Sequence, residues 1–166
     1  ISCMATDDRY ADDVHYVGGC LNLDKMHWAM SQMLVATAPP DPEIVGPEWR
    51  ETWLARLEGS GFAFLDWIEH QARDEFWKQG SACEDYASIQ CAVYAVGGWA
   101  GCYSNAVFRL LSNLDAPCKG LVGPWGHEYP HCGRPGPTLG FLQECVRWWD
   151  HWLKDIDTGI MNEPKL

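Results

Sequence analysis

Between residues 88 and 154 the chain alternates twice between a strand pattern and a helix pattern. Two short apolar runs, 91–96 (CAVYAV) and 118–123 (CKGLVG), have the length and composition of buried strands. A helical pattern that Ser104 can cap follows the first run, and another over about 139–154 follows the second. This order predicts a parallel sheet with its connecting helices on the faces, so we assign the chain to the α/β class.

The first half of the chain has a different pattern. Residues 1–20 read as a loop in which only the first residues can end a strand, and its Gly-Gly pair predicts a turn. Three consecutive helices are expected after it, without a strand between them. They cover 24–38, with Asp24 as cap and one face of methionines and Leu34, then a segment from Pro47 to Gly59, then about 62–79.

Ligands of open α/β sheets bind beyond the carboxyl ends of the strands. Here those ends are GGWAGCY after the first strand and GPWGHEYPH after the second. His127 lies four residues beyond the second strand, in a loop of glycines and prolines, and is the best-placed general base; the alternative is an ordinary loop histidine. Trp99 and Trp125 flank the two strand ends, where they either line a substrate pocket or pack in the core.

Four segments give the chain a specific resemblance: TDDRYADDVHYVGGCL near the start, EDYASIQCAVYAVGGWAGCYSNAVFRLL in the middle, and GLVGPWGHEYPH followed by GFLQECVRWWDHWLKDIDTGIMNEP at the end. They resemble the cocaine-esterase and X-prolyl dipeptidyl-peptidase-like serine hydrolases. The resemblance implies a partial α/β-hydrolase fold with a helical cap insertion, in which the chain order is nucleophile, acid and base. It places His127 at the position of the catalytic base.

The resemblance also implies a division of the chain into four parts. Residues 1–20 would be the end of a sheet strand and an active-site loop, and 21–87 the helical cap. Residues 88–154 would be the C-terminal part of the hydrolase domain, and 155–166 the start of a linker to a β (jelly-roll) domain.

The chain departs from this family at two catalytic positions. No G-x-S-x-G nucleophile motif occurs, because GSG at 59–61 and GSAC at 80–83 lack both its spacing and its preceding strand. The family reads G-W-x-D-G after the acid-bearing strand, whereas Gly101 stands here at the position of the acid. Asp85 and Glu128 are the carboxylates nearest in sequence that could replace it.

Two functions therefore remain open. One is a serine hydrolase fragment that acts on a small-molecule ester or amide, with His127 as general base. The other is a non-catalytic remnant or pseudoenzyme that keeps the fold as a binding or oligomerising module, and Gly101 motivates it. A metalloprotein that uses His127, His131 and Cys132 is a third, weaker alternative because a fourth ligand is missing. We expect no metal and no cofactor.

Composition excludes other partners. The 12 Lys and Arg residues against 23 Asp and Glu residues give a net charge of −11, which repels nucleic acid. The longest uncharged stretch, 86–108, is interrupted by glycines and predicts no membrane span. The eight cysteines have no zinc-ribbon spacing and are interpreted as reduced thiols of a cytoplasmic protein. Formation of a homo-oligomer is left open.

The beginning of the chain leads to two further expectations. The acidic run has no EF-hand pattern, so we expect a solvated loop with Arg9 as partner; it comprises Asp7, Asp8, Asp12 and Asp13. The chain starts at Ile1 without methionine or a signal-like run, and we interpret it as an interior fragment. A fragment of a sheet should expose an apolar face and an unpaired edge.

Overall fold

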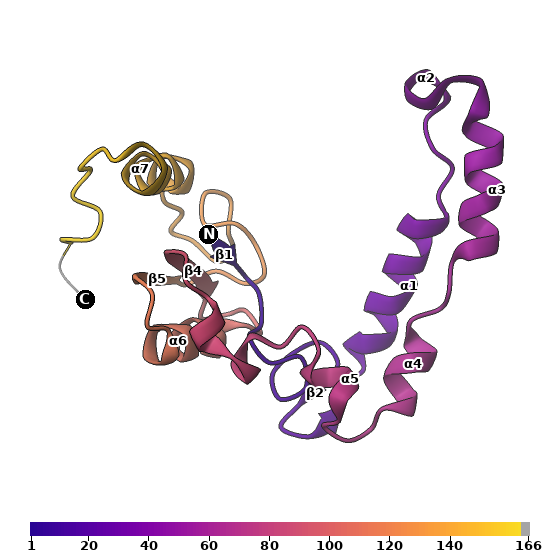
Figure 1. Cartoon of the computed structure of the whole chain (residues 1–166), viewed down its shortest axis with the longest axis horizontal. Helices are drawn as coiled ribbons and strands as arrows, with labels where there is room; N and C mark the ends of the chain where they lie inside the picture. Colours follow the sequence, from indigo (N-terminus) through magenta and orange to yellow (C-terminus); the bar gives the residue numbers. More distant parts are fainter. Residues whose placement is uncertain (164–166) are drawn as a thin grey trace.

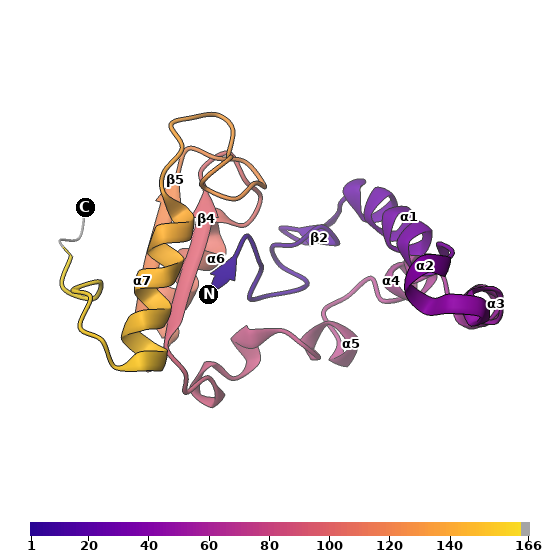
Figure 2. The same cartoon turned by 90° about the horizontal axis from the view of Figure 1, so that it is seen from above.

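The computed structural model describes residues 1–163, which form an α/β unit and a helical arm that projects from it (Figure 1). The α/β unit contains a three-stranded parallel sheet with the order β1-β4-β5. Helices α6 and α7 cover its two opposite faces (Figure 2). The elements are β1 (Ser2–Cys3), β4 (Val93–Gly98), α6 (Ser104–Asn113), β5 (Cys118–Gly123) and α7 (Phe141–Lys154). The predicted α/β class is confirmed.

Strand β4 begins and ends two residues later than the sequence predicts. It pairs with β5 in a continuous parallel register from Val93 opposite Cys118 to Gly98 opposite Gly123, so the two glycines expected to close the strand belong to it. Gly98 is required there because a Cβ atom would lie 1.9 Å from the carbonyl oxygen of Trp125. The close approach of two backbones explains why this strand ends in glycine.

The core of the α/β unit has two sides because β4 is buried on both faces. On one face, Tyr94 and Val96 pack with Phe141, Cys145 and Trp148 of α7. On the other face, Ala95 packs with Val107 and Leu110 of α6. Trp148 is buried in this core, whereas the neighbouring Trp149 is about half exposed.

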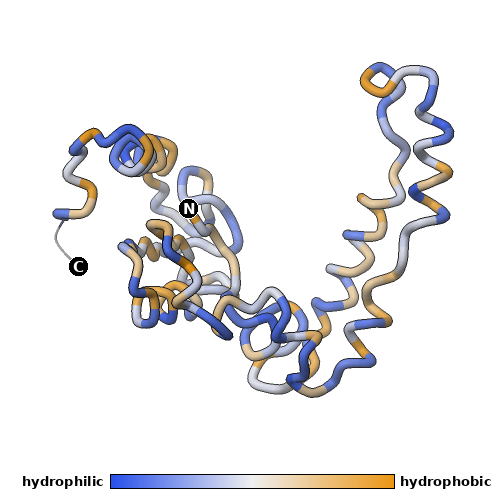
Figure 3. The backbone as a smooth tube through the Cα atoms, in the orientation of Figure 1, coloured by the Kyte–Doolittle hydropathy of each residue, from blue (hydrophilic) through white to orange (hydrophobic). Residues whose placement is uncertain are grey.

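One side of α7 exposes apolar side chains. Leu142, Val146, Trp149 and Leu153 are all exposed, and in Figure 3 this hydrophobic side of α7 turns toward the amino terminus of the chain. Within residues 1–163, β1 pairs only with β4 and leaves its other edge without a strand. The expected apolar face and unpaired sheet edge are therefore present.

The helical arm consists of α1 (Asp24–Thr37), α2 (Pro42–Val45), α3 (Trp49–Gly59) and α4 (Phe64–Glu69), with a 3-10 turn over Gly46–Glu48. The indole nitrogen of Trp53 donates to the carbonyl oxygen of Thr37 at 2.8 Å and ties α3 to the end of α1. The predicted methionine face of α1 exists but is exposed, because the described residues place no layer over it; it comprises Met26, Met30 and Met33, followed by Leu34.

Several helix boundaries differ from the sequence prediction. The single helix expected over 62–79 is two short helices, α4 and α5 (Glu75–Lys78). Asp74 explains the break, because its carboxylate accepts from the backbone N–H of Phe76 and caps a new helix. Asp24 and Ser104 were expected as caps, but each is the first residue of its helix.

The junction between the arm and the α/β unit consists of a hairpin and an aromatic cluster of Tyr16, Trp67 and Trp77. Strands β2 (Tyr16–Val17) and β3 (Cys20–Leu21) are connected by Gly18 and Gly19, both at positive φ, as a two-residue hairpin turn requires. Lys25 at the start of α1 is fully buried in this cluster, where its Nζ donates to the carbonyl oxygen of Trp67 at 2.6 Å and lies 4.2 Å from the ring centre of Tyr16. Burial lowers the pKa of Lys25 to about 8.

The acidic run is not the solvated loop that the sequence predicts. Asp7 is buried, and its carboxylate accepts from the guanidinium Nε of Arg109 at 2.8 Å and from its Nη2 at 2.5 Å. Asp12 accepts from Nη1 of the same arginine at 2.9 Å. The expected partner Arg9 instead donates to the backbone carbonyl oxygens of Phe76 and Gln79. The run thus anchors the loop after β1 to helix α6.

The segment after α7 returns to the sheet as far as it is described. Ile160 is fully buried in the α7 side of the core, and Nζ of Lys119 donates to its carbonyl oxygen at 2.9 Å. Residues 164–166 of the expected linker lie outside the described residues.

Two further observations bear on the setting of the protein. All eight cysteines are free thiols. Among the helices of residues 1–163, none combines the length and the apolar character needed to cross a membrane.

Candidate active site

The turn after β4 and the loop after β5 meet at the carboxyl edge of the sheet. The backbone N–H of Trp99 donates to the carbonyl oxygen of Gly123 at 2.7 Å, and that of Ala100 donates to Trp125 at 3.1 Å. Gly126 in turn donates to the carbonyl oxygen of Arg134 at 2.7 Å, which closes the loop on itself. These bonds hold the two segments that the sequence singles out against each other.

His127 follows directly on this tied segment and is exposed at its surface. Its imidazole ring lies beside the ring of Tyr103, with 5.4 Å between the ring centres and 60° between the planes. Within residues 1–163 the imidazole nitrogens make no hydrogen bond or ion pair to a protein group. Both nitrogens therefore remain available to a reacting group.

Gly101, which stands at the family's acid position, lies next to the backbone of Gly126, the residue before His127. Its N–H donates to the carbonyl oxygen of Gly98 at 2.9 Å and closes a tight turn. A Cβ atom on Gly101 would lie 3.3 Å from the carbonyl oxygens of Gly98 and Gly126, which is close but is not a severe clash. A side chain at this position would therefore start beside the residue that precedes the histidine, yet glycine offers it no carboxylate.

The two candidate pocket tryptophans occupy different environments. Trp99 is 65% exposed and stacks on Phe108, with 5.5 Å between ring centres. Trp125 is only 2% exposed, and its indole nitrogen donates to the carbonyl oxygen of Pro137 at 2.9 Å. Trp125 thus fills the interior of the loop that carries His127, while Trp99 presents an open aromatic face beside the strand ends.

Sequence reasoning did not connect two polar residues with this site: Tyr103, which lies beside His127, and Asp13, which binds Tyr103. The hydroxyl of Tyr103 donates to Oδ1 of Asp13 at 2.8 Å, and the same oxygen accepts from the backbone N–H of Val14 at 2.7 Å. Burial raises the pKa of Asp13, and burial together with the contact to Asp13 raises the pKa of Tyr103. The only sequence signals were the acidic run and a tyrosine two residues after Gly101.

The two carboxylates nearest in sequence to the candidate site are placed differently. Asp85 precedes β4, where its carboxylate accepts from the backbone N–H of Ser88, so the length of the strand separates it from His127 (Figure 2). Glu128 is exposed next to the histidine. Asp85 is therefore poorly placed to orient the imidazole.

The residues of the metal alternative do not converge. His131 stacks against Phe141, with 6.3 Å between ring centres, and against Tyr129 at 5.8 Å. In the described part of the chain, no three His, Cys, Asp or Glu side chains come close enough together to hold a metal ion. The geometry gives the metal interpretation no support.

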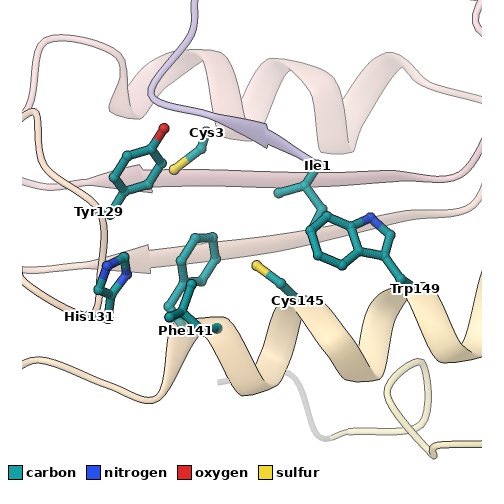
Figure 4. A pocket seen from close by; sticks show the side chains of 8 residues that line it. Ile1, Cys3, Tyr129, His131, Phe141, Cys145 and Trp149 are labelled. Atoms are coloured by element: carbon teal, nitrogen blue, oxygen red, sulfur yellow. The ribbon is translucent and has the colours of Figure 1, made fainter.

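A cavity of about 440 Å³ lies on a different side of the molecule, between β1 and α7 (Figure 4). Its lining is mainly apolar, and it includes His131 but not His127; the lining residues are Ile1, Cys3, Tyr129, His131, Phe141, Leu142, Cys145 and Trp149. It coincides with the exposed apolar side of α7. The cavity therefore lies beside the unpaired side of strand β1, whereas His127 lies beyond the carboxyl ends of β4 and β5.

Comparison with known proteins agrees with this architecture. Residues 1–129 match the family model described as X-Pro dipeptidyl-peptidase (S15 family). A protein of Mycobacterium bovis provisionally named a serine esterase is 32% identical over 89 residues, which are 49% of this chain and 14% of the relative; a similarly named protein of Mycobacterium tuberculosis matches to the same extent. A protein of Bacillus anthracis provisionally named an Xaa-Pro dipeptidyl-peptidase is 26% identical over 98 residues, 56% of this chain and 15% of the relative.

The matched region thus spans about one seventh of the length of these relatives, at 14% and 15%. The family match itself covers most of the chain, and the parallel sheet with helices on both faces is consistent with part of an α/β-hydrolase fold. The chain belongs to the X-Pro dipeptidyl-peptidase (S15) family of α/β-hydrolases.

Proposed function

We propose that this chain carries the part of a serine hydrolase that holds the general base, and that His127 is this base. The observation that carries the proposal is the position of the imidazole at the carboxyl edge of the sheet, beside the turn after β4 and with both nitrogens free of protein partners. The substrate class is a small ester or neutral amide. Family membership and the names of the relatives support hydrolysis as the reaction.

In the proposed reaction a serine attacks the carbonyl carbon of the substrate, and His127 takes the proton of the serine hydroxyl. The same imidazole then gives that proton to the leaving alcohol or amine, and water releases the acyl group in a second cycle. The serine must come from a part of the protein outside residues 1–166, because these contain no G-x-S-x-G motif. Trp99 is the better candidate for the substrate pocket because its indole is exposed beside the strand ends.

Each segment of the chain has a proposed role in the complete hydrolase. Residues 21–87, which include the helical arm, would form a cap, and residues 88–154 would complete the hydrolase sheet. Residues 1–20 would supply the end of a strand and a loop beside the active site, and 155–166 would lead toward a β domain.

A second candidate function is a non-catalytic member of the family, and Gly101 favours it. Loss of the triad acid alone costs about 10⁴ in turnover, and loss of the serine costs about 10⁶. If no other group replaces the acid, even a protein with a serine would be a slow hydrolase.

Hydrolysis of a short-chain aryl ester tests the role of His127. The full-length protein, which would supply the serine, and its His127→Ala variant are compared, with His131→Ala as a matched control from the same loop. We expect His127→Ala to abolish the hydrolysis that remains and His131→Ala to preserve it, because only His127 lies at the strand ends. Equal rates in the protein and in His127→Ala would contradict the assignment.

Restoring the acid separates the two candidate functions. Gly101→Asp should raise kcat by about 10² or more, since a Cβ atom would make a tight contact at 3.3 Å but no severe clash, and the carboxylate would start beside Gly126. Gly101→Asn is the control, because it has the same shape without the charge. A gain with aspartate but not with asparagine supports an enzyme with a damaged triad, whereas no gain with either supports a non-catalytic protein.

A further inference from the structure

We propose that Tyr103, anchored by Asp13, is a positioning residue that holds the imidazole of His127 at the strand ends. This inference rests on the proposed role of His127 and adds two residues, neither of which has a role in the reaction scheme above. It is carried by a chain of contacts that joins the loop after β1, the turn after β4 and the loop after β5.

The first contact is between two rings. Tyr103 and His127 lie with 5.4 Å between ring centres at an angle of 60°, a tilted arrangement that is favourable for aromatic pairs. His127 is exposed, and within residues 1–163 no protein hydrogen bond fixes its nitrogens. The ring of Tyr103 therefore forms a wall on one side of the imidazole and removes the rotamers that would cross it.

The second contact fixes this wall. The hydroxyl of Tyr103 donates to Oδ1 of Asp13 at 2.8 Å, and the side chain of Asp13 is only 12% exposed. The carboxylate is fixed in turn by the backbone N–H of Val14, and its other oxygen lies 3.7 Å from Nε2 of the buried His15. Because the hydroxyl of the tyrosine is held as well as its backbone, the orientation of its ring is restricted.

The absence of a carboxylate at Gly101 makes this contact important. In a complete triad the acid holds the imidazole in the orientation that the serine needs. A displacement of 1 Å at a catalytic group can cost about 10² in rate, so a ring that limits the motion of His127 recovers part of what the acid would provide. Tyr103 cannot replace the charge of the acid, because its hydroxyl is engaged with Asp13.

Nuclear magnetic resonance of the protein with ¹³C-labelled histidine tests the positioning directly. The signal of His127 is assigned by its loss in His127→Gln. We expect the Hε1 resonance to carry a ring-current shift that Tyr103→Ala removes. Tyr103→Phe and Asp13→Ala should each broaden or partly move the signal, since both keep the ring and remove the hydrogen bond that anchors it, and the double variant should move it no further than either single one.

A matched control comes from the same loop. Tyr129 stacks on His131, with 5.8 Å between ring centres, and has no such contact with His127. Tyr129→Ala should therefore move the signal of His131 and leave that of His127 in place. An unchanged His127 signal in both Tyr103→Ala and Tyr103→Phe would overturn the proposal, even if Tyr103→Ala proved poorly folded.

Kinetics separates this inference from the proposed function. In the aryl-ester assay, Tyr103→Ala should lower kcat about tenfold with little change in KM, and the loss should shrink in a Gly101→Asp background where a carboxylate holds the imidazole. An equal loss in both backgrounds would contradict a positioning role. If no variant hydrolyses the ester, the proposed function fails, and the histidine spectra alone decide whether Tyr103 positions the imidazole.

Discussion

The α/β unit and the helical arm are both rich in apolar side chains, but they bury them very differently. In the α/β unit, β4 lies between α6 and α7, and Tyr94, Ala95 and Val96 are almost completely buried. In the arm, α3 has no buried residue, and the methionine face of α1 is exposed. A parallel strand with crossover helices finds its packing partners within a short stretch of chain, whereas a pair of helices needs a third layer from elsewhere.

The junction between the two regions resembles the α/β unit in how completely its side chains are buried. Asp7, Lys25 and Trp77 are all almost completely buried there, and each makes a hydrogen bond or an ion pair. The comparison therefore predicts that substitutions in the sheet and at the junction cost much more stability than similar substitutions in the arm.

The largest effect is expected from removing a large core ring. Trp148→Ala should lower the free energy of unfolding by about 4 kcal/mol, because it empties the space that Trp148 fills against Tyr94 on the α7 side of the core. Trp28→Ala in α1 should cost less than about 1 kcal/mol, since that indole is 46% exposed. Urea unfolding followed by circular dichroism measures both. Equal costs would show that the arm is as tightly packed as the sheet.

A somewhat smaller effect is expected at the junction. Asp7→Asn should cost about 3 kcal/mol, because it leaves the guanidinium of Arg109 without the buried carboxylate that it contacts twice. The control is Glu75→Gln, which breaks a surface pair with Lys78 in α5 and should cost less than about 0.5 kcal/mol. Denaturant unfolding at low and high salt compares the two. A loss for Asp7→Asn as small as that of the control would argue against a buried anchor.

A methyl group at a close backbone approach should have an intermediate effect. Gly98→Ala should cost about 2 kcal/mol and disturb the loop of His127, because the new Cβ atom would meet the carbonyl oxygen of Trp125. Gly59→Ala at the end of α3 meets no atom within 4 Å and should change stability by less than about 1 kcal/mol, in the stabilising direction. Thermal unfolding of the two variants decides. A harmless Gly98→Ala would mean that the two turns are not held as closely as described.

The smallest effect is a pH dependence at the junction. Burial, followed by the charges of Lys25 and Arg9, lowers the pKa of His15 to about 4. Between the pKa of His15 in the folded protein and that in the unfolded chain, the unfolded state binds more protons. His15 should therefore reduce stability by about 1 kcal/mol as the pH falls from about 7 to about 5.5.

Replacing the histidine tests this slope. His15→Gln should remove that part of the pH dependence, whereas His27→Gln on the exposed surface of α1 should keep it. Unfolding curves of the three proteins across this pH range give the comparison. An unchanged slope in His15→Gln would show that another group at the junction titrates.

The sequence was a good guide wherever the signal was local. The second apolar run predicted β5, and the Gly-Gly pair predicted the turn that joins β2 to β3, although the two short strands themselves were not expected. It failed where a distant group competes. The helix expected over 62–79 breaks because Asp74 caps a new helix, and Asp7 is buried because Arg109, 102 residues away, meets it.

The candidate site shows the same division. The strand order and the family motifs in the sequence were enough to predict where His127 should lie, and the sequence alone showed that Gly101 stands at the acid position and that no G-x-S-x-G motif is present. Asp13 and Tyr103 could not be predicted, because 90 residues separate them and neither belongs to a motif with a known spacing.

The sequence by itself determined the α/β class, the family and the identity of the candidate base, because periodicity and short motifs record local geometry and local chemistry. Only the tertiary structure decided which side chains meet. It showed Asp7 on Arg109, Tyr103 between Asp13 and His127, and an apolar side of α7 left uncovered within the described residues. The physical reason is that such contacts depend on how parallel strands and loops converge in space, which no local stretch of sequence encodes.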